Sequence, residues 1–97
     1  MNRVFVISAP HGKNLEPAKE FGPLTVMLDG HETAIMAQDR LNDYLTQFTT
    51  EDFLLLIGNP IHIAAAIFLI SVQRPQWVKL LVWDRESQTY QMERLYA

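Results

Sequence analysis

Apolar and polar residues alternate along the chain in blocks that predict strands and helices in turn. Residues 4–7 and 24–28 are short apolar runs closed by turn residues, and each predicts a strand. Residues 15–21 have room for one helical turn at most, because prolines lie within and just after the segment. Between residues 32 and 48 the apolar positions recur with helical spacing, which predicts an amphipathic helix.

The predicted helix over residues 32–48 has an apolar face and a polar face. The apolar face is expected to bury Ala34, Ile35, Met36, Ala37, Leu41, Tyr44, Leu45 and Phe48. The polar face is expected to carry Glu32, Gln38, Asp39, Asn42, Asp43 and Gln47. This helix should therefore pack one side against a sheet.

A strand-to-helix turn follows in the second half of the chain. Residues 53–57 are apolar without alternation, as in a strand buried on both faces. Asn59 is a good helix N-cap, and Pro60 suits the first helical position, where its missing N–H costs nothing. The helix predicted over residues 61–72 is apolar nearly all round, so it needs cover on more than one side, from a central position or a subunit interface.

The apolar window of residues 53–72 is also about as long as a bilayer span. The Gly58-Asn59-Pro60 turn and His62, however, would interrupt a spanning helix and place polar groups in hydrocarbon. We therefore expect no membrane segment.

The rest of the chain completes a ββαβαββ order. Residues 77–83 predict a strand, residues 84–89 a polar turn and residues 90–96 an edge strand that pairs back. Two strand–helix–strand units predict parallel pairing with right-handed crossovers. The connection over residues 8–23 can be an antiparallel loop or a parallel crossover, and we favour the crossover. The sequence thus predicts one domain over residues 1–97, a small Rossmann-like α/β sandwich of two or three layers with a mostly parallel sheet of about five strands and a C-terminal antiparallel hairpin.

Trp77 and Trp83 lie six residues apart on a predicted strand, so both should point to one face. Core packing against a helix is the plainer interpretation, and an aromatic platform for a base or a partner is the alternative. Lys79 shares that face and favours partial exposure.

Charge and cysteine content narrow the functional classes. The 97 residues carry a net charge of −3 and no basic run, which argues against electrostatic binding to duplex nucleic acid. The absence of cysteine excludes disulfides, thiolate zinc sites and a cysteine nucleophile. The apolar stretch near the N-terminus is too short for a secretory signal, so a cytoplasmic location is expected.

Side chains with useful chemistry follow several predicted strands. Ligands of parallel sheets bind at the carboxyl ends of the strands. The candidate ligand-binding residues there are Ser8, His11, Lys13, Asp29, His31, Gly58 and Asn59. The N–H groups of the helix that begins at Pro60, with Lys13 or a histidine, would suit a phosphate-bearing or nucleotide-like ligand. The plainer interpretation is a structural strand-to-helix turn, because neither GxGxxG nor GxxxxGK(S/T) is present.

His11, Asp29 and His31 together have the composition of a metal site with two histidines and one carboxylate. Nothing in their spacing requires a metal, so we expect neither a metal nor another cofactor. Ser8 lacks a nucleophile elbow and no motif positions a pair of carboxylates, which argues against an enzyme.

Two stretches carry a resemblance to a known family. They are residues 54–60 (LLLIGNP) before an alanine-rich helix, and residues 78–85 (VKLLVWDR). With residues 4–8 and 18–22, they resemble a small family of α/β proteins encoded by tailed bacteriophages, over most of the chain. That family carries no assigned activity or catalytic residues. The resemblance therefore implies a phage gene product acting in the cytoplasm of the infected bacterium and leaves the biochemistry open.

Three functions can be weighed. The first is a non-enzymatic accessory protein that forms a homo-oligomer and binds a host or phage protein, favoured by the small size, the acidic balance and the apolar helix over residues 61–72. The second is a small anion- or nucleotide-binding protein that uses the rim of Lys13, His31 and Asn59. An enzyme on nucleotides or a metal-dependent hydrolase is the least favoured.

Overall fold

The computed structural model describes residues 2–9 and 13–97, and its elements follow the predicted order. They are β1 (Val4–Ser8), the 3-10 helix η1 (Glu16–Phe21), β2 (Leu24–Leu28), α1 (Ala34–Leu45), β3 (Phe53–Leu55), α2 (Pro60–Val72), β4 (Trp77–Asp84) and β5 (Thr89–Tyr96).

A five-stranded sheet of order β2-β1-β3-β4-β5 forms the middle of the molecule. β1 pairs in parallel with both β2 and β3, and β3 pairs in parallel with β4, whereas β5 returns antiparallel to β4. The mostly parallel α/β sheet with a C-terminal antiparallel hairpin is therefore confirmed, and the connection from β1 to β2 is a parallel crossover. The connection that leaves β1 leads to one edge of the sheet and the connection that leaves β3 leads to the other, so the strand order reverses between β1 and β3.

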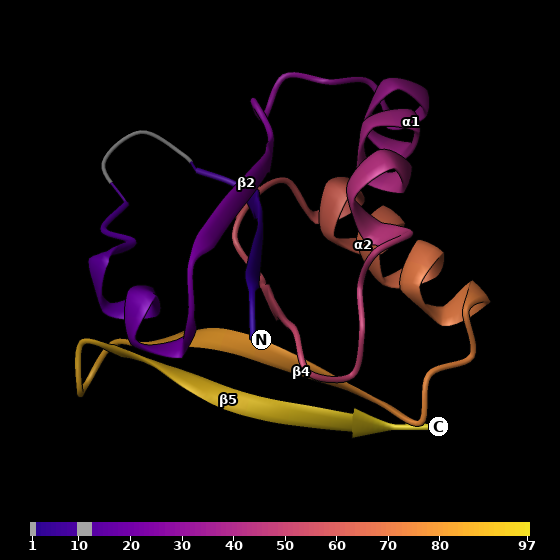
Figure 1. Ribbon diagram of the computed structural model, residues 1–97. Helices are drawn as coiled ribbons and strands as arrows, with labels where there is room; N and C mark the ends of the chain where they lie inside the picture. Colours follow the sequence, from indigo (N-terminus) through magenta and orange to yellow (C-terminus); the bar gives the residue numbers. More distant parts are fainter. Residues whose placement is uncertain (1, 10–12) are drawn as a thin grey trace.

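The sheet has helices on both faces (Figure 1). On one face, Leu41 of α1 and Ile70 of α2 belong to the same core cluster as Phe5 of β1. On the other, Ala18 of η1 packs with Val4 of β1. Since neighbouring residues of a strand point to opposite faces, β1 contributes to both cores, and the fold has three layers.

β3 is shorter than the strand predicted over residues 53–57. It ends at Leu55 because the N–H of Ile57 donates back to the Leu55 carbonyl at 3.0 Å. Gly58 then turns the chain with a φ of 136°. The N–H of Ser8 still donates to the Ile57 carbonyl at 3.2 Å, so this segment stays beside the end of β1.

The first turn of α1 is more exposed than its apolar sequence predicts. Ile35 is 75% exposed and Met36 is 48% exposed, so their predicted burial is wrong. The buried residues of α1 are Ala37, Leu41 and Leu45, which repeat every four residues along one side of the helix. Because each residue turns the helix by about 100°, Ile35 and Met36 point away from that side.

The partial exposure that Lys79 favours for its face of β4 is found at the two tryptophans, whereas Lys79 itself is buried. Trp77 and Trp83 are both partly buried along β4, and Trp83 packs on the cluster that contains Phe53. Lys79, between the two tryptophans, is only 8% exposed. Its ammonium lies 4.0 Å from the centre of the Phe53 ring, a cation–π contact that offsets part of the cost of burial.

α2 packs through one side and leaves its outer side open. His62, Ala66 and Ile70 are buried, whereas Ile61 and Phe68 are 51% and 59% exposed. The expected cover on more than one side is therefore not supplied by the described residues. Within that same part of the chain, no helix has the length and apolar character needed to cross a membrane.

Candidate functional site

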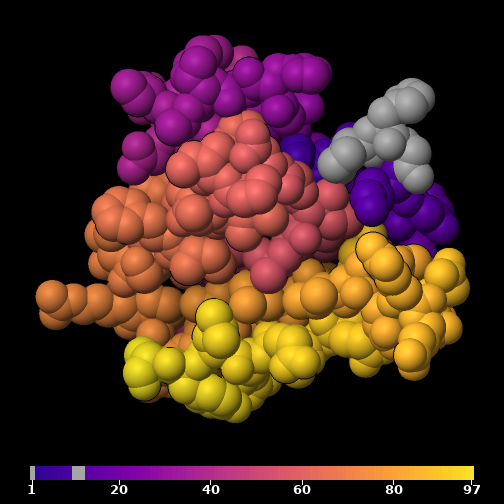
Figure 2. Space-filling model, turned by 180° about the vertical axis from the view of Figure 1, so that it is seen from behind, coloured from indigo at the N-terminus to yellow at the C-terminus, as the bar shows by residue number. Residues whose placement is uncertain are grey.

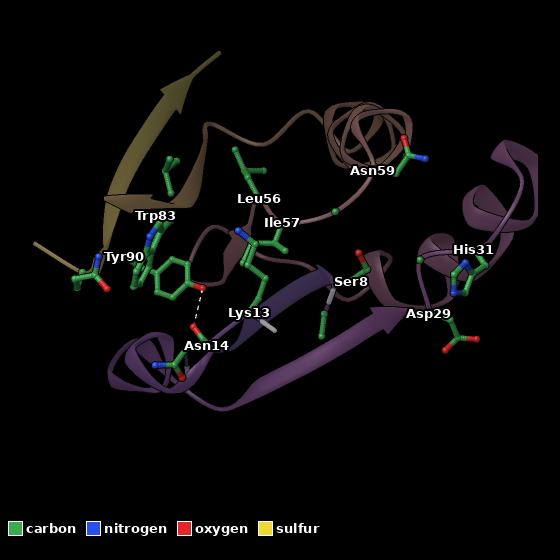
Figure 3. A pocket seen from close by; sticks show the side chains of 15 residues that line it. Ser8, Lys13, Asn14, Asp29, His31, Leu56, Ile57, Asn59, Trp83 and Tyr90 are labelled. Carbon is green, nitrogen blue, oxygen red and sulfur yellow. Dashed lines mark hydrogen bonds between the residues drawn. The ribbon is translucent and has the colours of Figure 1, made fainter. Parts of the chain in front are cut away.

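A cleft of about 1060 Å³ opens along the carboxyl ends of the strands. Six of the predicted ligand-binding residues line it: Ser8, Lys13, Asp29, His31, Gly58 and Asn59 (Figure 3). The seventh, His11, lies outside the described residues. The cleft includes the ends of β1 and β3, on either side of the point where the strand order reverses, which is where open α/β sheets bind ligands.

The two ends of the cleft differ in chemistry. Trp83 and Tyr90 form an aromatic end, Asp29 and His31 lie at the opposite polar end, and Ser8 lies between them (Figure 3). The rings of Trp83 and Tyr90 meet edge to face, with their centroids 4.9 Å apart. A ligand that fills the cleft therefore meets an apolar wall and a set of polar groups at once.

A long-range hydrogen bond holds the aromatic end in place. The Tyr90 hydroxyl donates to the Asn14 carbonyl at 3.2 Å and so ties β5 to the segment before η1. Burial raises the pKa of Tyr90, so the hydroxyl keeps its proton at neutral pH. The Asn14 side chain in turn accepts from the N–H of Glu16 at 3.0 Å. The wall of the cleft is thus fixed before any ligand enters.

The Ser8 side chain meets the backbone of Gly58 in the middle of the cleft. Ser8 ends β1 and is 2% exposed. A Cβ built on Gly58 would lie 2.5 Å from Ser8 Oγ, and the φ of 136° is one that other residues rarely adopt. Glycine is therefore required at this position, and it lets the Ser8 hydroxyl share the floor of the cleft with the Gly58 backbone.

The start of α2 borders the cleft at Asn59. The predicted N-cap is confirmed, because Asn59 Oδ1 accepts from the N–H of Ile61 at 3.0 Å. The Asn59 carbonyl accepts from the N–H groups of His62 and Ile63 at 2.9 and 3.1 Å. Pro60 has no N–H. The helix N–H groups that a phosphate was expected to use are therefore occupied, and an anion in the cleft needs other donors.

Those donors are side chains from four places along the chain. Lys13 extends into the cleft from the segment before η1 (Figure 3). Ser8 contributes a hydroxyl from the end of β1, and the Asn59 amide borders the cleft ahead of α2. His31 adds an imidazole from the loop after β2. A cationic ammonium with hydroxyl, amide and imidazole groups around it suits a phosphate or a carboxylate.

The loop that carries residues 29–31 is held by Glu32. The prediction that Glu32 lies on the polar face of a helix is wrong, because Glu32 is 8% exposed and precedes α1. Its carboxylate accepts from the N–H groups of Asp29 at 2.9 Å and Gly30 at 2.8 Å. It also pairs with Arg40 at 2.8 Å. Helical periodicity cannot reveal this role, and the only sequence signal is a glutamate two residues after a turn glycine.

The Glu32 carboxylate is ionised throughout the neutral range. Burial alone would raise its pKa, but hydrogen bonds from the backbone N–H groups of Asp29, Glu32 and Gly30 act in the opposite direction. Together with the charge of Arg40, they lower the pKa from its ordinary value of 4.5 to about 2. The polar end of the cleft is therefore shaped by a side chain that is charged at neutral pH.

Glu32 also connects the cleft to α2. Its carbonyl lies 2.8 Å from Nε2 of His62, which is fully buried. Because a carbonyl can only accept, Nε2 is the donor in this hydrogen bond. Within residues 2–9 and 13–97, the buried Nδ1 of the same ring has no hydrogen-bond partner.

The described residues do not assemble a metal centre. No group of three or more histidine, aspartate or glutamate side chains in residues 2–9 and 13–97 is placed to hold a metal ion. Asp29, one member of the set weighed from the sequence, pairs instead with Arg40 at 3.3 Å. The chemistry that this part of the cleft offers is hydrogen bonding, charge pairing and ring contact.

Comparison with known proteins shows which family the chain belongs to. The family model described as "Phage Pam3 gp32-like protein" matches residues 2–95, nearly the whole chain. The resemblance to bacteriophage proteins is therefore confirmed. Neither the curated proteins nor the solved structures give a significant match.

Proposed function

The chain belongs to the phage Pam3 gp32-like protein family, and we propose that this phage protein binds a small nucleotide-like anion in the cleft at the carboxyl ends of its strands. One observation carries the proposal. Ser8 and Lys13, from the end of β1 and the connection that follows it, and Asn59, far along the chain ahead of α2, line a single cleft that also has an aromatic end. A large cleft with a few converging polar groups is the usual form of a small-molecule site.

The two ends of the cleft suit the two parts of such a ligand. Trp83 offers an aromatic surface for a planar ring, and contacts of this kind stabilise a bound base by about 1–3 kcal/mol. Lys13 and Ser8 offer donors for an anionic group. The volume of about 1060 Å³ lies at the upper end of the range for small-molecule sites, so a nucleotide-sized ligand fits better than a lone ion.

Calorimetric titration with AMP, adenosine and inorganic phosphate tests the proposal. AMP should bind at least about tenfold more tightly than adenosine or phosphate, because only AMP engages both ends of the cleft. Lys13→Ala should weaken AMP binding by about 10- to 100-fold, the size of a lost charged hydrogen bond. The same variant should leave adenosine binding unchanged.

Lys19→Ala is the matched control. Lys19 is an exposed lysine of η1 that pairs with Glu16 at 2.7 Å and does not line the cleft. The substitution changes the net charge by the same amount as Lys13→Ala but should leave AMP affinity unaltered. The proposal fails if AMP gives no binding, or if both lysine variants weaken binding equally, which would indicate attraction by overall charge alone.

A second candidate function is a non-enzymatic accessory role through protein contacts in the cytoplasm of the infected cell. The observation that favours it is the outer side of α2, where Ile61, Phe68 and Val72 are 51%, 59% and 66% exposed. Large apolar side chains gathered on one surface are typical of protein interaction sites. A host protein, another phage protein and a second copy of the chain are the partners to consider.

A further inference from the structure

We propose that the ligand of the cleft is a nucleoside phosphodiester, with one singly charged phosphate in the middle of the cleft and a nucleoside on each side of it. The inference rests on the proposed function and names the class of nucleotide that the same cleft takes. Three features carry it: the order of charges along the cleft, the length of the cleft and the different chemistry of its two ends.

The lining of the cleft carries one positive and one negative side chain. Among the described lining residues, Lys13 is the only lysine or arginine, and Asp29 is the only aspartate or glutamate. Lys13 and Ser8 lie between the aromatic end and the polar end (Figure 3). The attraction for an anion is therefore in the middle of the cleft, where one ammonium can balance a single negative charge.

The polar end of the cleft repels a further negative charge. Asp29 and Glu32 share one cation there, because Arg40 lies 3.3 Å from Oδ2 of Asp29 and 2.8 Å from Oε2 of Glu32. Two carboxylates and one guanidinium leave one negative charge uncompensated. A phosphate at this end would meet like charge, whereas the hydroxyl groups of a sugar can donate to carboxylate oxygens. The polar end therefore suits an uncharged, hydroxyl-bearing part of a ligand.

The aromatic end of the cleft is uncharged. Trp83 and Tyr90 line it, and the Tyr90 hydroxyl is held by its hydrogen bond to the Asn14 carbonyl. Because burial raises the pKa of Tyr90, this hydroxyl carries no charge at neutral pH. A nucleobase can contact the two rings, whereas a phosphate finds no cation beside them. The aromatic end therefore suits a base.

The cleft is long enough for two nucleosides because it crosses four neighbouring strands. Asp29 follows β2, Ser8 ends β1, Gly58 follows β3 and Trp83 lies near the end of β4. Neighbouring strands lie about 4.8 Å apart, so the four strand ends span about 14 Å. In Figure 2, α1, which follows the polar end, lies at the top, and the turn between β4 and β5, beside the aromatic end, lies at the lower right. A nucleotide with its base at Trp83 and its phosphate at Ser8 therefore leaves room for a second nucleoside at the polar end.

A phosphodiester meets these conditions together. It keeps a single negative charge, whereas a phosphate monoester carries about −1.5 to −2 at neutral pH and the triphosphate of ATP carries more. It also has an organic group on both sides of phosphorus, one for each end of the cleft. Stacked bases lie only about 3.4 Å apart along a strand, so a dinucleotide that reaches both ends is bound with its bases unstacked.

Calorimetric titration of the full chain with adenylyl-(3′,5′)-adenosine (ApA), AMP and ATP tests the phosphodiester at one ionic strength. ApA should bind at least about tenfold more tightly than AMP, because it occupies both ends of the cleft, and ATP should bind no more tightly than AMP. His31→Ala removes a side chain of the polar end and should reduce the preference for ApA to less than about threefold. Gln38→Ala, an exposed position of α1 outside the cleft, is the control and should keep the full preference.

Asp29→Asn tests the charge of the polar end. The substitution should raise AMP affinity by about two- to fivefold, because it removes a charge that repels the phosphate, and it should not raise ApA affinity. Arg40 keeps Glu32 as its partner in this variant. Asp39→Asn is the matched control: it makes the same change in net charge on the exposed side of α1, outside the cleft, and should leave both affinities unchanged.

A free dinucleotide and a single strand of nucleic acid offer the same phosphodiester chemistry. Titration with hexa-adenylate distinguishes the two sources. An affinity no higher than that of ApA identifies a free dinucleotide, whereas an affinity at least about tenfold higher identifies a strand that continues beyond the cleft.

Three results would overturn the phosphodiester. They are AMP or ATP binding as tightly as ApA, a His31→Ala variant that keeps the full preference for ApA, and equal effects of Asp29→Asn and Asp39→Asn. Unchanged circular dichroism checks the fold of each variant. AMP binding without a preference for ApA overturns the phosphodiester and leaves the proposed function standing, whereas a protein that binds none of the nucleotides overturns both.

Discussion

Gly58 sets the shape of the cleft through its backbone and its lack of a side chain. Gly58→Ala should lower the free energy of unfolding by about 1–3 kcal/mol from the positive φ alone. The added Cβ would also lie 2.5 Å from Ser8 Oγ, which adds to that cost. Gly30→Ala is the control, because Gly30 also has a positive φ, of 106°, but its Cβ would be 4.0 Å from Ser8. Urea denaturation should show the larger loss for Gly58→Ala, and equal losses would contradict the close contact.

Glu32 makes stability depend on pH in the acid range. Its pKa is about 2 in the folded protein against an ordinary value of 4.5, so its contribution is complete above pH 4.5 and is lost as the pH falls toward 2. Glu32→Gln should cost about 1–3 kcal/mol at neutral pH. In urea denaturation, the difference in unfolding free energy between the two proteins should shrink below pH 4.5.

The control for this pH effect is Glu16→Gln, which removes an exposed carboxylate paired with Lys19 on η1. Its difference from the wild type should be small at every pH, because exposed ion pairs contribute little. A Glu32→Gln difference that stays constant down to pH 2 would show that the loop is not held by the ionised carboxylate.

At the scale of elements, the N-cap of α2 connects helix stability to the cleft. Asn59→Ala removes the bond to the Ile61 N–H and should lower stability by about 1 kcal/mol. Asn59→Asp keeps a capping oxygen and adds a charge that favours a helix start, so stability should be retained. The same charge at the border of the cleft should weaken AMP binding. Thermal unfolding and calorimetric titration of both variants measure the two effects, and equal behaviour of Ala and Asp would contradict the account.

The elements themselves follow largely from local sequence. The apolar runs predict β1, β2 and β4, and the Asn59-Pro60 pair predicts the start of α2. The wrong predictions concern side chains whose burial depends on contacts with residues distant in the sequence. Ile35 and Met36 are exposed because the buried side of α1 is set by its packing on the sheet. Periodicity describes one segment at a time and cannot register such contacts.

At the scale of the whole molecule, the topology explains why the candidate site could be anticipated in part. Parallel strands end at the same edge, so a ββαβαββ order brings the loops after β1, β2 and β3 together. The sequence therefore predicts the polar rim that holds Ser8, Asp29 and Asn59. The aromatic end was not predicted at the cleft: Trp83 lies at the carboxyl end of β4, and Tyr90 reaches it through the pairing of β4 with β5. The exposure of the outer side of α2 could not be predicted either, because it depends on which surfaces the rest of the chain covers.

The most direct test of ligand binding in the cleft is an NMR titration of ¹⁵N-labelled protein with AMP. Binding in the cleft should cause progressive chemical-shift changes in residues 29–31, in Gly58 and Asn59, and in the indole N–H of Trp83. Trp77, on the same strand but outside the cleft, provides the internal comparison and should not shift. Absence of shifts, or shifts confined to the outer side of α2, would contradict the central claim.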